Sequence, residues 1–255
     1  MDKKKLEHLF DLTGRVAIVT GGTRGIGRAI AEGFVAAGAK VVVASRKAEA
    51  CEETERHLQS MGEALGVPTH LGELDALTAL VSRTVDRFGR LDIVVNNAAN
   101  ALTQPLGQFT PDAWDKSYAV NLRGPVFLVQ EALPYLTESP SAAIVNVISA
   151  GAFLFSANTA MYSGAKAGLM AFTRAMGADF AARGIRVNAL APGTVDTDMV
   201  RNNPVEQQQS MARASFMRRA ADPDEMVGPA LFLASDASSF MTGQCLIVDG
   251  GLTPH

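Results

Sequence analysis

Cysteine, histidine and long apolar runs are all scarce in this sequence. Cys51 and Cys245 are the two cysteines in 255 residues, and they lie far apart. Because they have no CxxC spacing, two free thiols in a reducing compartment are the simplest interpretation, which predicts a cytoplasmic protein. The four histidines are scattered along the chain without a ligand pattern, so no metal site is expected.

No segment is apolar for long enough to span a bilayer, and the lysine run at residues 3–5 precedes no apolar signal segment. Residues 1–12 are therefore interpreted as a solvated N-terminal tail. The formal net charge of −3 gives no support for a nucleic-acid partner or an anionic membrane.

The composition, with 47% hydrophobic and 19% charged residues, is that of a globular protein with an ample core. The chain has no linker, repeat or low-complexity tract, so a single domain is expected over residues 1–255. Apolar, β-rich runs alternate with helical segments, which predicts an α/β fold with a doubly wound parallel sheet and helices on both faces. The expected strands lie at residues 15–20, 40–45, near 68–72, within 91–99, and at 143–148, 185–190 and 245–251.

A glycine-rich turn joins the first expected strand to the helix that follows it. Gly21, Gly25 and Gly27 have the spacing G-x3-G-x-G. Glycines leave room for a pyrophosphate, and the N-terminus of the helix offers it backbone amides and a positive dipole end. The turn indicates a dinucleotide site, although taken alone it is equally compatible with a strand–turn–helix that binds nothing.

The end of the second strand indicates which dinucleotide would bind. An acidic residue there would bind the 2′-hydroxyl of an adenosine ribose, but this chain has Ser45, Arg46 and Lys47. A hydroxyl and a guanidinium suit a 2′-phosphate, so NADP(H) is predicted, with Arg24 of the glycine turn assisting from the other side. The alternative is that Arg46 only begins a solvated helix.

The segment 149–166 carries the expected chemistry. Ser149 follows the fifth strand, at the carboxyl edge where open α/β sheets bind ligands. Tyr162 and Lys166 are four residues apart and share one face of a helix, where the ammonium is expected to lower the pKa of the phenol towards neutral. The pair predicts a proton donor and acceptor at working pH, although tyrosine and lysine at this spacing also occur as surface residues.

Three further segments bear on the site. A helix is expected from residue 111 to about 137, and it places Asn121 in mid-helix, either as a satisfied buried amide or as a functional group. Asn96 and Asn97 close the fourth strand, where their amides are expected to tie neighbouring strands together and to floor the adenosine site. Residues 198–220 are expected to form a mobile helical flap that closes on substrate.

Together these motifs resemble the short-chain dehydrogenase/reductase family over essentially all of residues 13–251. TGGTRGIG, NNAA, Asn121, Ser149, YSGAK, PGTVDT and the closing DGG occur in the family's order and spacing. The resemblance implies a three-layer Rossmann-like sheet of strand order 3-2-1-4-5-6-7 and a homotetramer. It implies that Tyr162 is the acid/base and that Ser149 hydrogen-bonds the reacting oxygen. By the same resemblance Lys166 binds the nicotinamide ribose and Asn121 orders a relay water.

The resemblance also implies that Val195 and Thr197 hold the carboxamide of the cofactor. The implied cofactor-binding set is Gly21, Thr23, Arg24, Gly25, Ile26, Gly27, Ser45, Arg46, Leu71, Asn97, Ala98, Tyr162, Lys166, Val195 and Thr197. Two positions depart from the family pattern. Ala99 stands where the family commonly has NNAG, and His70 stands where many members place an aspartate beside the adenine, so only backbone contacts from Leu71 are expected there. HLGELDAL, NNAA and the GGLTPH ending resemble a carbonyl-reductase and retinol-dehydrogenase-like branch.

The sequence thus predicts an NADPH-dependent oxidoreductase that reduces a ketone or aldehyde to an alcohol by hydride transfer. An apolar carbonyl is favoured over a sugar, unless Phe153 and Phe155 belong to the core or to a subunit interface. One alternative is a 3-oxoacyl-thioester (acyl-carrier-protein) reductase, with Arg218 and Arg219 as the candidate basic pair for the carrier. The other is a non-catalytic NADP-binding regulator. The apolar candidates are Leu102, Phe153, Leu154, Phe155, Met199 and Val200.

Overall fold

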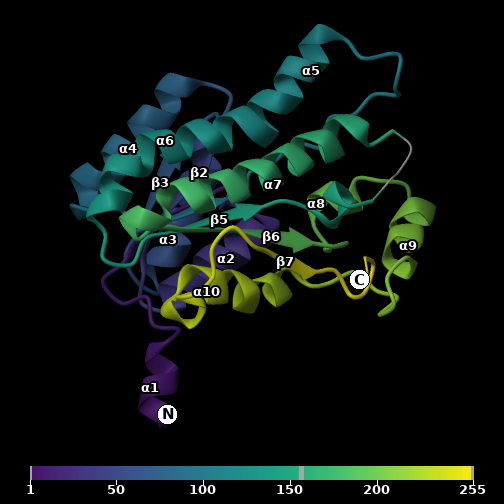
Figure 1. Cartoon of the computed structure of the whole chain (residues 1–255). Helices are drawn as coiled ribbons and strands as arrows, with labels where there is room; N and C mark the ends of the chain where they lie inside the picture. The colour runs from purple at the N-terminus through teal and green to yellow at the C-terminus, as the bar shows by residue number, and fades with distance from the viewer. Residues whose placement is uncertain (1, 155–157, 254–255) are drawn as a thin grey trace.

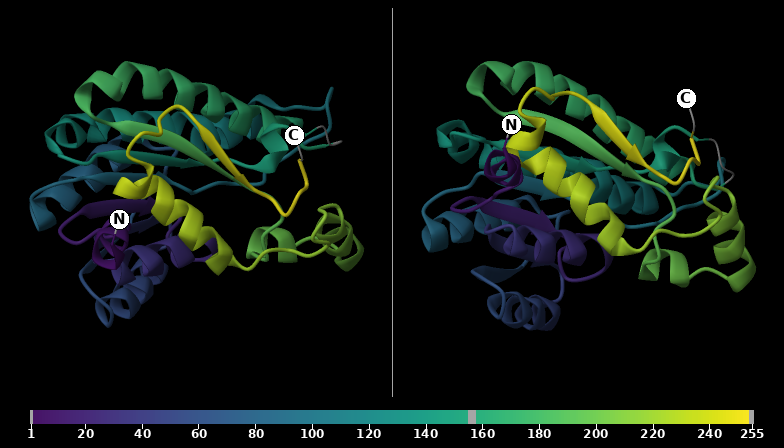
Figure 2. Two further views of the ribbon diagram at one scale, coloured as in Figure 1. Left: turned by 60° about the horizontal axis from the view of Figure 1, so that its bottom comes forward. Right: turned by 90° about the horizontal axis from the view of Figure 1, so that it is seen from below.

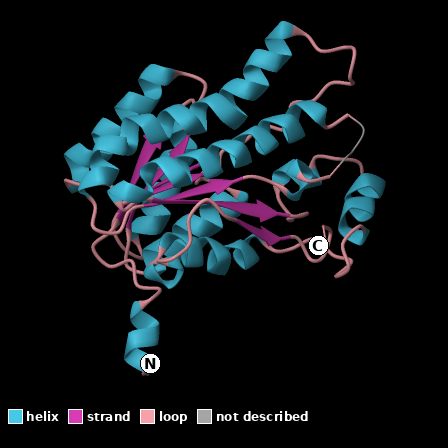
Figure 3. Ribbon diagram, in the orientation of Figure 1, coloured by secondary structure: helices cyan, strands magenta, loops and turns pink. Residues whose placement is uncertain are grey.

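The computed structural model describes residues 2–154 and 158–253, and its centre is one parallel sheet (Figure 3). The strand order is β3-β2-β1-β4-β5-β6-β7, which confirms the predicted order 3-2-1-4-5-6-7. The strands are β1 (Val16–Thr20), β2 (Lys40–Ser45), β3 (Ala64–Pro68), β4 (Ile93–Asn96), β5 (Ala143–Val147), β6 (Arg186–Pro192) and β7 (Cys245–Val248).

Helices cover both faces of this sheet, as the alternation of strands and helices predicts (Figures 1 and 2). One core cluster joins the sheet to α2 (Gly25–Ala36), α3 (Ala48–Gln59) and α10 (Val227–Ala234). A second cluster joins it to α4 (Leu74–Phe88), α6 (Gly124–Glu138) and α7 (Ala160–Phe180). Short 3₁₀ turns lie at Ala150–Ala152, Ala181–Arg183, Pro223–Met226 and Asp236–Ser238.

The continuous apolar strands are explained by burial on both faces. In β1, Ala17 and Val19 belong to the first core cluster and Ile18 belongs to the second. All five residues of β1 are buried. A strand that faces a helical layer on each side is buried at every position, which is why its apolar run shows no alternation with exposed polar residues.

The third strand lies four residues earlier than predicted. The expected strand near residues 68–72 is wrong, since β3 ends at Pro68, which pairs with Ser45 of β2. Residues beyond it form a turn, in which the backbone N–H of Gly72 donates to His70 Nδ1 at 3.1 Å. Proline is tolerated here because β3 is an edge strand, so a missing N–H leaves no inner neighbour without a donor.

The single helix predicted over residues 111–137 is interrupted. The structure has α5 (Pro111–Tyr118), then a π-helical turn at Ala119–Arg123, then α6. Gly124 donates its backbone N–H to the Ala119 carbonyl, five residues back. Pro125 has no N–H, so it cannot make the usual bond to the Asn121 carbonyl four residues earlier. Asn121 therefore lies in the irregular turn rather than in a regular helix, and such turns are frequent at functional sites.

The N-terminal prediction is wrong in part. Residues Lys3–His8 form a short exposed helix, α1, which projects from the body of the molecule (Figure 1). Leu12, the last residue of the predicted solvated tail, is fully buried, and its N–H donates to the Ala37 carbonyl at 2.8 Å. The ordered body of the molecule thus begins before residue 13.

The segment predicted as a flap contains two short helices, α8 (Asp198–Arg201) and α9 (Val205–Arg213). Its two ends are tied together, because Asp196 donates its N–H to the Ala221 carbonyl and Ala221 donates to the Thr194 carbonyl, each at 2.9 Å. Tied ends give the segment a defined base beside β6. Its mobility stays a prediction.

Candidate functional site

A cavity of about 540 Å³ lies at the carboxyl edge of the sheet, between the glycine turn, the ends of the central strands, α7 and α8. Fourteen of the fifteen sequence-predicted cofactor residues line it. They are Gly21, Thr23, Arg24, Gly25, Ile26, Gly27, Ser45, Arg46, Leu71, Asn97, Ala98, Tyr162, Lys166 and Thr197. Residues far apart in the sequence are therefore brought to one cavity.

Val195 is the predicted cofactor residue that does not line the cavity. Its side chain is buried, and its backbone forms an isolated bridge with Ala221. The side chain of Asn121 is also fully buried, behind the cavity wall. Ser149 does not line the cavity itself, but it is hydrogen-bonded to Tyr162, which does.

The glycine turn is held against the end of β4 by Thr20. The Thr20 hydroxyl oxygen accepts from the backbone N–H groups of Asn97 and Ala98 at 2.9 and 3.1 Å, and Asn97 Nδ2 donates to the Thr20 carbonyl at 2.9 Å. A Cβ on Gly27 would lie 2.3 Å from both Asn97 Nδ2 and the Gly21 carbonyl oxygen. Glycine is thus required at residue 27 by the packing of the turn on the NNAA segment. The expected contact of Asn97 with the neighbouring strand is confirmed.

Two guanidiniums line the cavity in different surroundings. Within residues 2–154 and 158–253, Arg46 makes no ion pair. Arg24, by contrast, places Nη1 3.2 Å from Asp198 Oδ2, at the first residue of α8. The predicted assistance of Arg24 at a 2′-phosphate therefore has a competitor on the protein itself.

His70 occupies the position of the family's aspartate but turns away from the cavity. Its Nδ1 accepts from Gly72, which fixes the ring within the turn after β3. Thr69 and Leu71 line the cavity instead. The expectation that Leu71 rather than His70 bounds this part of the site agrees with that geometry.

Tyr162 stands in the first turn of α7, where a hydrogen bond joins its phenol to the Ser149 hydroxyl. Burial raises the pKa of Tyr162 above its ordinary value, and the hydrogen bond from Ser149 opposes that rise. Ser149 Oγ also accepts from the Gly151 N–H at 3.0 Å, which orients the hydroxyl. The Tyr162 phenol is therefore protonated at neutral pH.

Lys166 is almost fully buried on the same face of α7. Its Nζ donates to the Val147 carbonyl at 2.8 Å and lies 5.8 Å from the centre of the Tyr162 ring. Burial lowers the pKa of Lys166 to about 8. The predicted lowering of the Tyr162 pKa by Lys166 is not found, because burial of the phenol dominates and the ammonium is directed to the Val147 carbonyl.

Both amide atoms of Asn121 already have protein partners. Asn121 Nδ2 donates to the Asn100 carbonyl at 3.0 Å and to Ser117 Oγ at 3.2 Å. Asn121 Oδ1 accepts from the Asn100 N–H at 3.0 Å. Of the two alternatives open from sequence, the satisfied buried amide describes the side chain, which links the π-helical turn to the loop after β4.

The glycines of α7 admit close neighbours. A Cβ on Gly164 would lie 2.9 Å from the Tyr118 hydroxyl, and one on Gly168 would lie 3.3 Å from Leu122. Tyr118 stacks on Trp114 of α5 at a centroid distance of 4.2 Å. The glycine in YSGAK therefore lets α5 pack closely against α7, a reason that the spacing alone does not reveal.

Several cavity residues were not singled out from the sequence for this role. Most lie one or two positions from a predicted residue. Their place near the end of an expected strand could therefore have identified them from the sequence. Of the flap residues, Met199 was among the apolar candidates, whereas Asn202 and Asn203 carried no such signal, because their approach depends on the fold of residues 193–203. The additional lining residues are Ala44, Thr69, Ala99, Asn100, Ala101, Val120, Val147, Ile148, Pro192, Asp198, Asn202 and Asn203.

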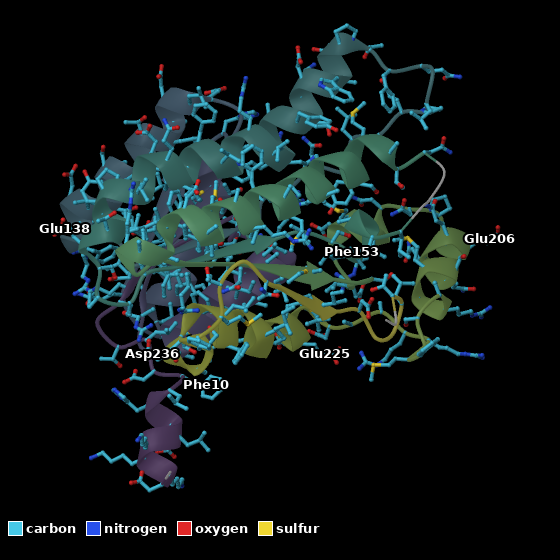
Figure 4. The ribbon with its side chains drawn as sticks, in the orientation of Figure 1. Phe10, Glu138, Phe153, Glu206, Glu225 and Asp236 are labelled. Carbon is cyan, nitrogen blue, oxygen red and sulfur yellow. The ribbon has the colours of Figure 1, made fainter. Side chains whose placement is uncertain are left out.

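The apolar substrate candidates separate into groups. Met199 lines the cavity. Phe153 packs against the small core cluster that contains Ile148 and Leu169. In Figure 4 it lies on the same side of the molecule as Glu206 of α9. Phe155 lies outside the described residues. Leu102, Leu154 and Val200 do not line the cavity.

No helix in the described part of the chain is both long and apolar enough to cross a bilayer. Across residues 2–154 and 158–253 there is also no group of three or more histidine, cysteine, aspartate or glutamate side chains placed to hold a metal ion.

Comparison with known proteins shows similarity over nearly the whole chain. The profile of the family described as "Enoyl-(Acyl carrier protein) reductase" matches residues 21–253. Cis-4-hydroxycyclohexanecarboxylate dehydrogenase of Sinomonas cyclohexanicum is 40% identical over 241 residues, covering 94% of this chain and 96% of the relative. A 3-oxoacyl-[acyl-carrier-protein] reductase of Synechocystis is 37% identical over 248 residues, covering 94% of this chain and 98% of the relative.

Among solved structures, the RhlG/NADP active-site complex of Pseudomonas aeruginosa has a TM-score of 0.91 and 32% identity, and covers 96% of this chain and 98% of that chain. The two curated relatives are a dehydrogenase and a reductase matched over nearly their whole length, and the solved structure shares the fold of this chain. With the strand order and the cavity described above, these matches show that the chain belongs to the short-chain dehydrogenase/reductase family of oxidoreductases.

Proposed function

We propose that this protein is an NADP(H)-dependent oxidoreductase that interconverts a ketone or aldehyde and its alcohol. The observation that carries the proposal is the hydrogen-bonded Tyr162–Ser149 pair above a buried Lys166, at one end of a cavity that begins at a glycine turn. Solved relatives that contain NADP support the same cofactor here.

The lining residues fit a phosphorylated dinucleotide. The glycine turn opens α2 and presents its N-terminus to the cavity, where backbone amides and the helix dipole favour a pyrophosphate. Ser45 and Arg46 line the cavity at the end of β2, with no carboxylate at that position to favour an unphosphorylated ribose. When bound, the nicotinamide supplies or accepts the hydride.

Tyr162 is the proposed proton donor and acceptor, and Ser149 the proposed hydrogen-bond donor to the reacting oxygen. Because the pKa of Tyr162 is raised, the phenol holds its proton at neutral pH, which is the form that can protonate a carbonyl oxygen in the reductive direction. Lys166, which donates to the Val147 carbonyl, is the residue proposed to bind the nicotinamide ribose. For Asn121 we propose the backbone carbonyl rather than the side-chain amide as the water ligand, since the amide is occupied by Asn100.

The proposed substrate is a small apolar carbonyl compound. Met199 contributes an apolar surface to the cavity, and the name of the relative cis-4-hydroxycyclohexanecarboxylate dehydrogenase supports a substrate with an apolar ring. A 3-oxoacyl thioester is the second candidate, supported by the similar carrier-protein reductases. The candidate basic pair for a carrier is weakened, because Arg219 is held by Glu225 through contacts of 2.6 and 2.8 Å.

The proposal is tested with Tyr162→Phe. This change removes the phenolic proton and leaves the ring, so NADPH should bind as before while turnover of apolar ketones falls by orders of magnitude. NADPH titration and initial rates against aromatic ketones, α-dicarbonyls, keto sugars and an acetoacetyl thioester give both readouts. A wild-type protein that binds NADPH and turns over none of these would favour the regulator, and a fully active variant would remove Tyr162 from its role.

We further propose a cytoplasmic homotetramer in which residues 1–255 act as one domain. Cys51 and Cys245 are both free thiols, as expected in a reducing compartment. All four residues of the edge strand β7 are partly exposed and apolar, and Phe240, just before it, is fully exposed. A second copy that covers this edge would bury them.

A further inference from the structure

The ion pair between Arg24 and Asp198 lies within the cofactor cavity. Arg24 immediately precedes α2 and Asp198 begins α8, so the pair joins the glycine turn to the start of the 198–220 segment. Both residues line the same cavity as Ser45 and Arg46. The pair therefore lies where it would interact electrostatically with the phosphates of a bound dinucleotide.

The approach of the two segments does not depend on this pair alone. A Cβ on Gly25 would lie 3.0 Å from Thr197 Cγ2, so the glycine turn and the residue before Asp198 are already in close contact. Arg201, the last residue of α8, is engaged with Asp196 at 2.8 and 2.9 Å. Arg24 is thus the partner that the fold presents to Asp198.

The pair is exposed and hence easily exchanged. The side chains of Arg24 and Asp198 are 71% and 53% exposed. Solvent screening makes such pairs weak, so a phosphate with two negative charges competes well with one carboxylate for the same guanidinium. A carboxylate that remained beside that phosphate would also repel it.

We propose that Asp198 competes with the 2′-phosphate of NADP(H) for the Arg24 guanidinium and so limits how strongly the site prefers the phosphorylated cofactor. The inference rests on the proposed NADP(H) site and adds a selectivity residue to it. Arg46 makes no ion pair in the described part of the chain, so its contribution to the preference for NADP(H) over NAD(H) is not reduced by a carboxylate. The contribution of Arg24 to the same preference is reduced by Asp198.

The test is the ratio of the dissociation constants for NADH and NADPH, measured by fluorescence titration of the full-length protein. Asp198→Asn keeps the size of the side chain and removes its charge, so the ratio should rise about two- to fivefold in favour of NADPH, the range of one surface ion pair. Glu206→Gln is the control, because it removes one charge from the same segment at an exposed position of α9 outside the cavity (Figure 4). Its ratio should equal that of the wild type.

Arg24→Gln separates competition from simple repulsion. In that background Asp198→Asn should no longer change the ratio. The proposal is overturned if Asp198→Asn leaves the wild-type ratio unchanged or lowers it, if Glu206→Gln raises it equally, or if the effect persists undiminished without Arg24. A wild-type protein that prefers NADPH but does not respond to Asp198→Asn refutes this inference alone. A wild-type protein with no preference, unaltered by Arg46→Asp, refutes the proposed cofactor as well.

Discussion

At the scale of single residues, Lys166 and Tyr162 show how burial alters the chemistry that their spacing predicts. The four-residue spacing places both on one face of α7, as expected. Burial disfavours the charged form of each group, so the pKa of Tyr162 rises and the pKa of Lys166 falls to about 8. The protonated phenol is the form that reduction requires.

We expect the rate of carbonyl reduction to be nearly constant around pH 7 and to fall as the pH rises through about 8. The reason is that Lys166 is charged below its pKa of about 8 and neutral above it, whereas Tyr162, with its raised pKa, keeps its proton over this range. The measurement is the pH profile of kcat/KM for NADPH, which reports groups of the free enzyme, because the proposed role of Lys166 is to bind the nicotinamide ribose. In Lys166→Arg the residual activity should lose the decline near pH 8, and a wild-type profile that stays flat to pH 9 would contradict the assignment.

Gly27 is a second residue whose requirement is local and steric. Gly27→Ala should destabilise the protein and weaken NADPH binding, because the new Cβ would lie 2.3 Å from Asn97 Nδ2 and from the Gly21 carbonyl oxygen. Gly228→Ala is the matched control: it lies in α10 with no atom within 4 Å of the new Cβ, and it should stabilise by about 0.5–1 kcal/mol. Urea denaturation and NADPH titration measure both effects, and equal stability of the two variants would refute the steric argument.

At the scale of elements, a buried polar chain joins two strands to the helix that carries Tyr162. Asn96 Nδ2 donates to Asn146 Oδ1 at 2.8 Å, and Asn146 Nδ2 donates to Thr173 Oγ1 at 2.9 Å. Thr173 stands two turns after Lys166 in α7 and donates to the Leu169 carbonyl at 2.8 Å. These buried hydrogen bonds supplement the contact between Lys166 and β5, and together they set the position of α7 along the strands.

Thr173→Val should therefore cost about 1–3 kcal/mol of unfolding free energy, because it leaves Asn146 Nδ2 buried without its acceptor. Thr173→Ser keeps the hydroxyl and should cost less. Thr137→Val is the surface control, since it removes a similar hydroxyl bond, to the Leu133 carbonyl, at an exposed position of α6. Equilibrium denaturation of the three variants is the measurement. Equal losses in Thr173→Val and Thr137→Val would show that the buried chain adds nothing.

At the scale of the whole molecule, the two edges of the sheet differ. β3 ends in Pro68, which cannot donate to a further strand, whereas β7 presents four partly exposed apolar residues next to the fully exposed Phe240. This asymmetry favours self-association at β7 rather than at β3.

Phe240→Asp should lower the mass of the assembly measured by sedimentation velocity, because a charge would replace an apolar side chain at the proposed interface. Met61→Asp, at an exposed position just before β3, should leave the mass unchanged. A monomeric wild-type protein would refute the tetramer, and a Phe240→Asp protein with wild-type mass would move the interface elsewhere.

Much of the fold could be predicted because its signals are local. Short β-branched runs, the glycine turn and the serine–tyrosine–lysine spacing each depend on a few neighbouring residues, and their order along the chain leads to the parallel sheet. Boundaries were less accurate where local signals conflict, as at β3, where Pro68 ends the strand instead of beginning it. In the helix after residue 111, Gly124 and Pro125 replace regular hydrogen bonds with a π turn.

The sequence by itself determined the sheet, the family and a cofactor-binding set of which every member but Val195 lines the cavity, because each of these follows from short motifs in a fixed order. Only the tertiary structure decided that Asn121 is saturated by Asn100, that Val195 is turned into the interior and that Arg24 meets Asp198, 174 positions away. It also reversed the expected direction of the Tyr162 pKa. These outcomes depend on which residues from distant parts of the sequence come into contact and on how deeply they are buried. The spacing of residues along the sequence does not specify either.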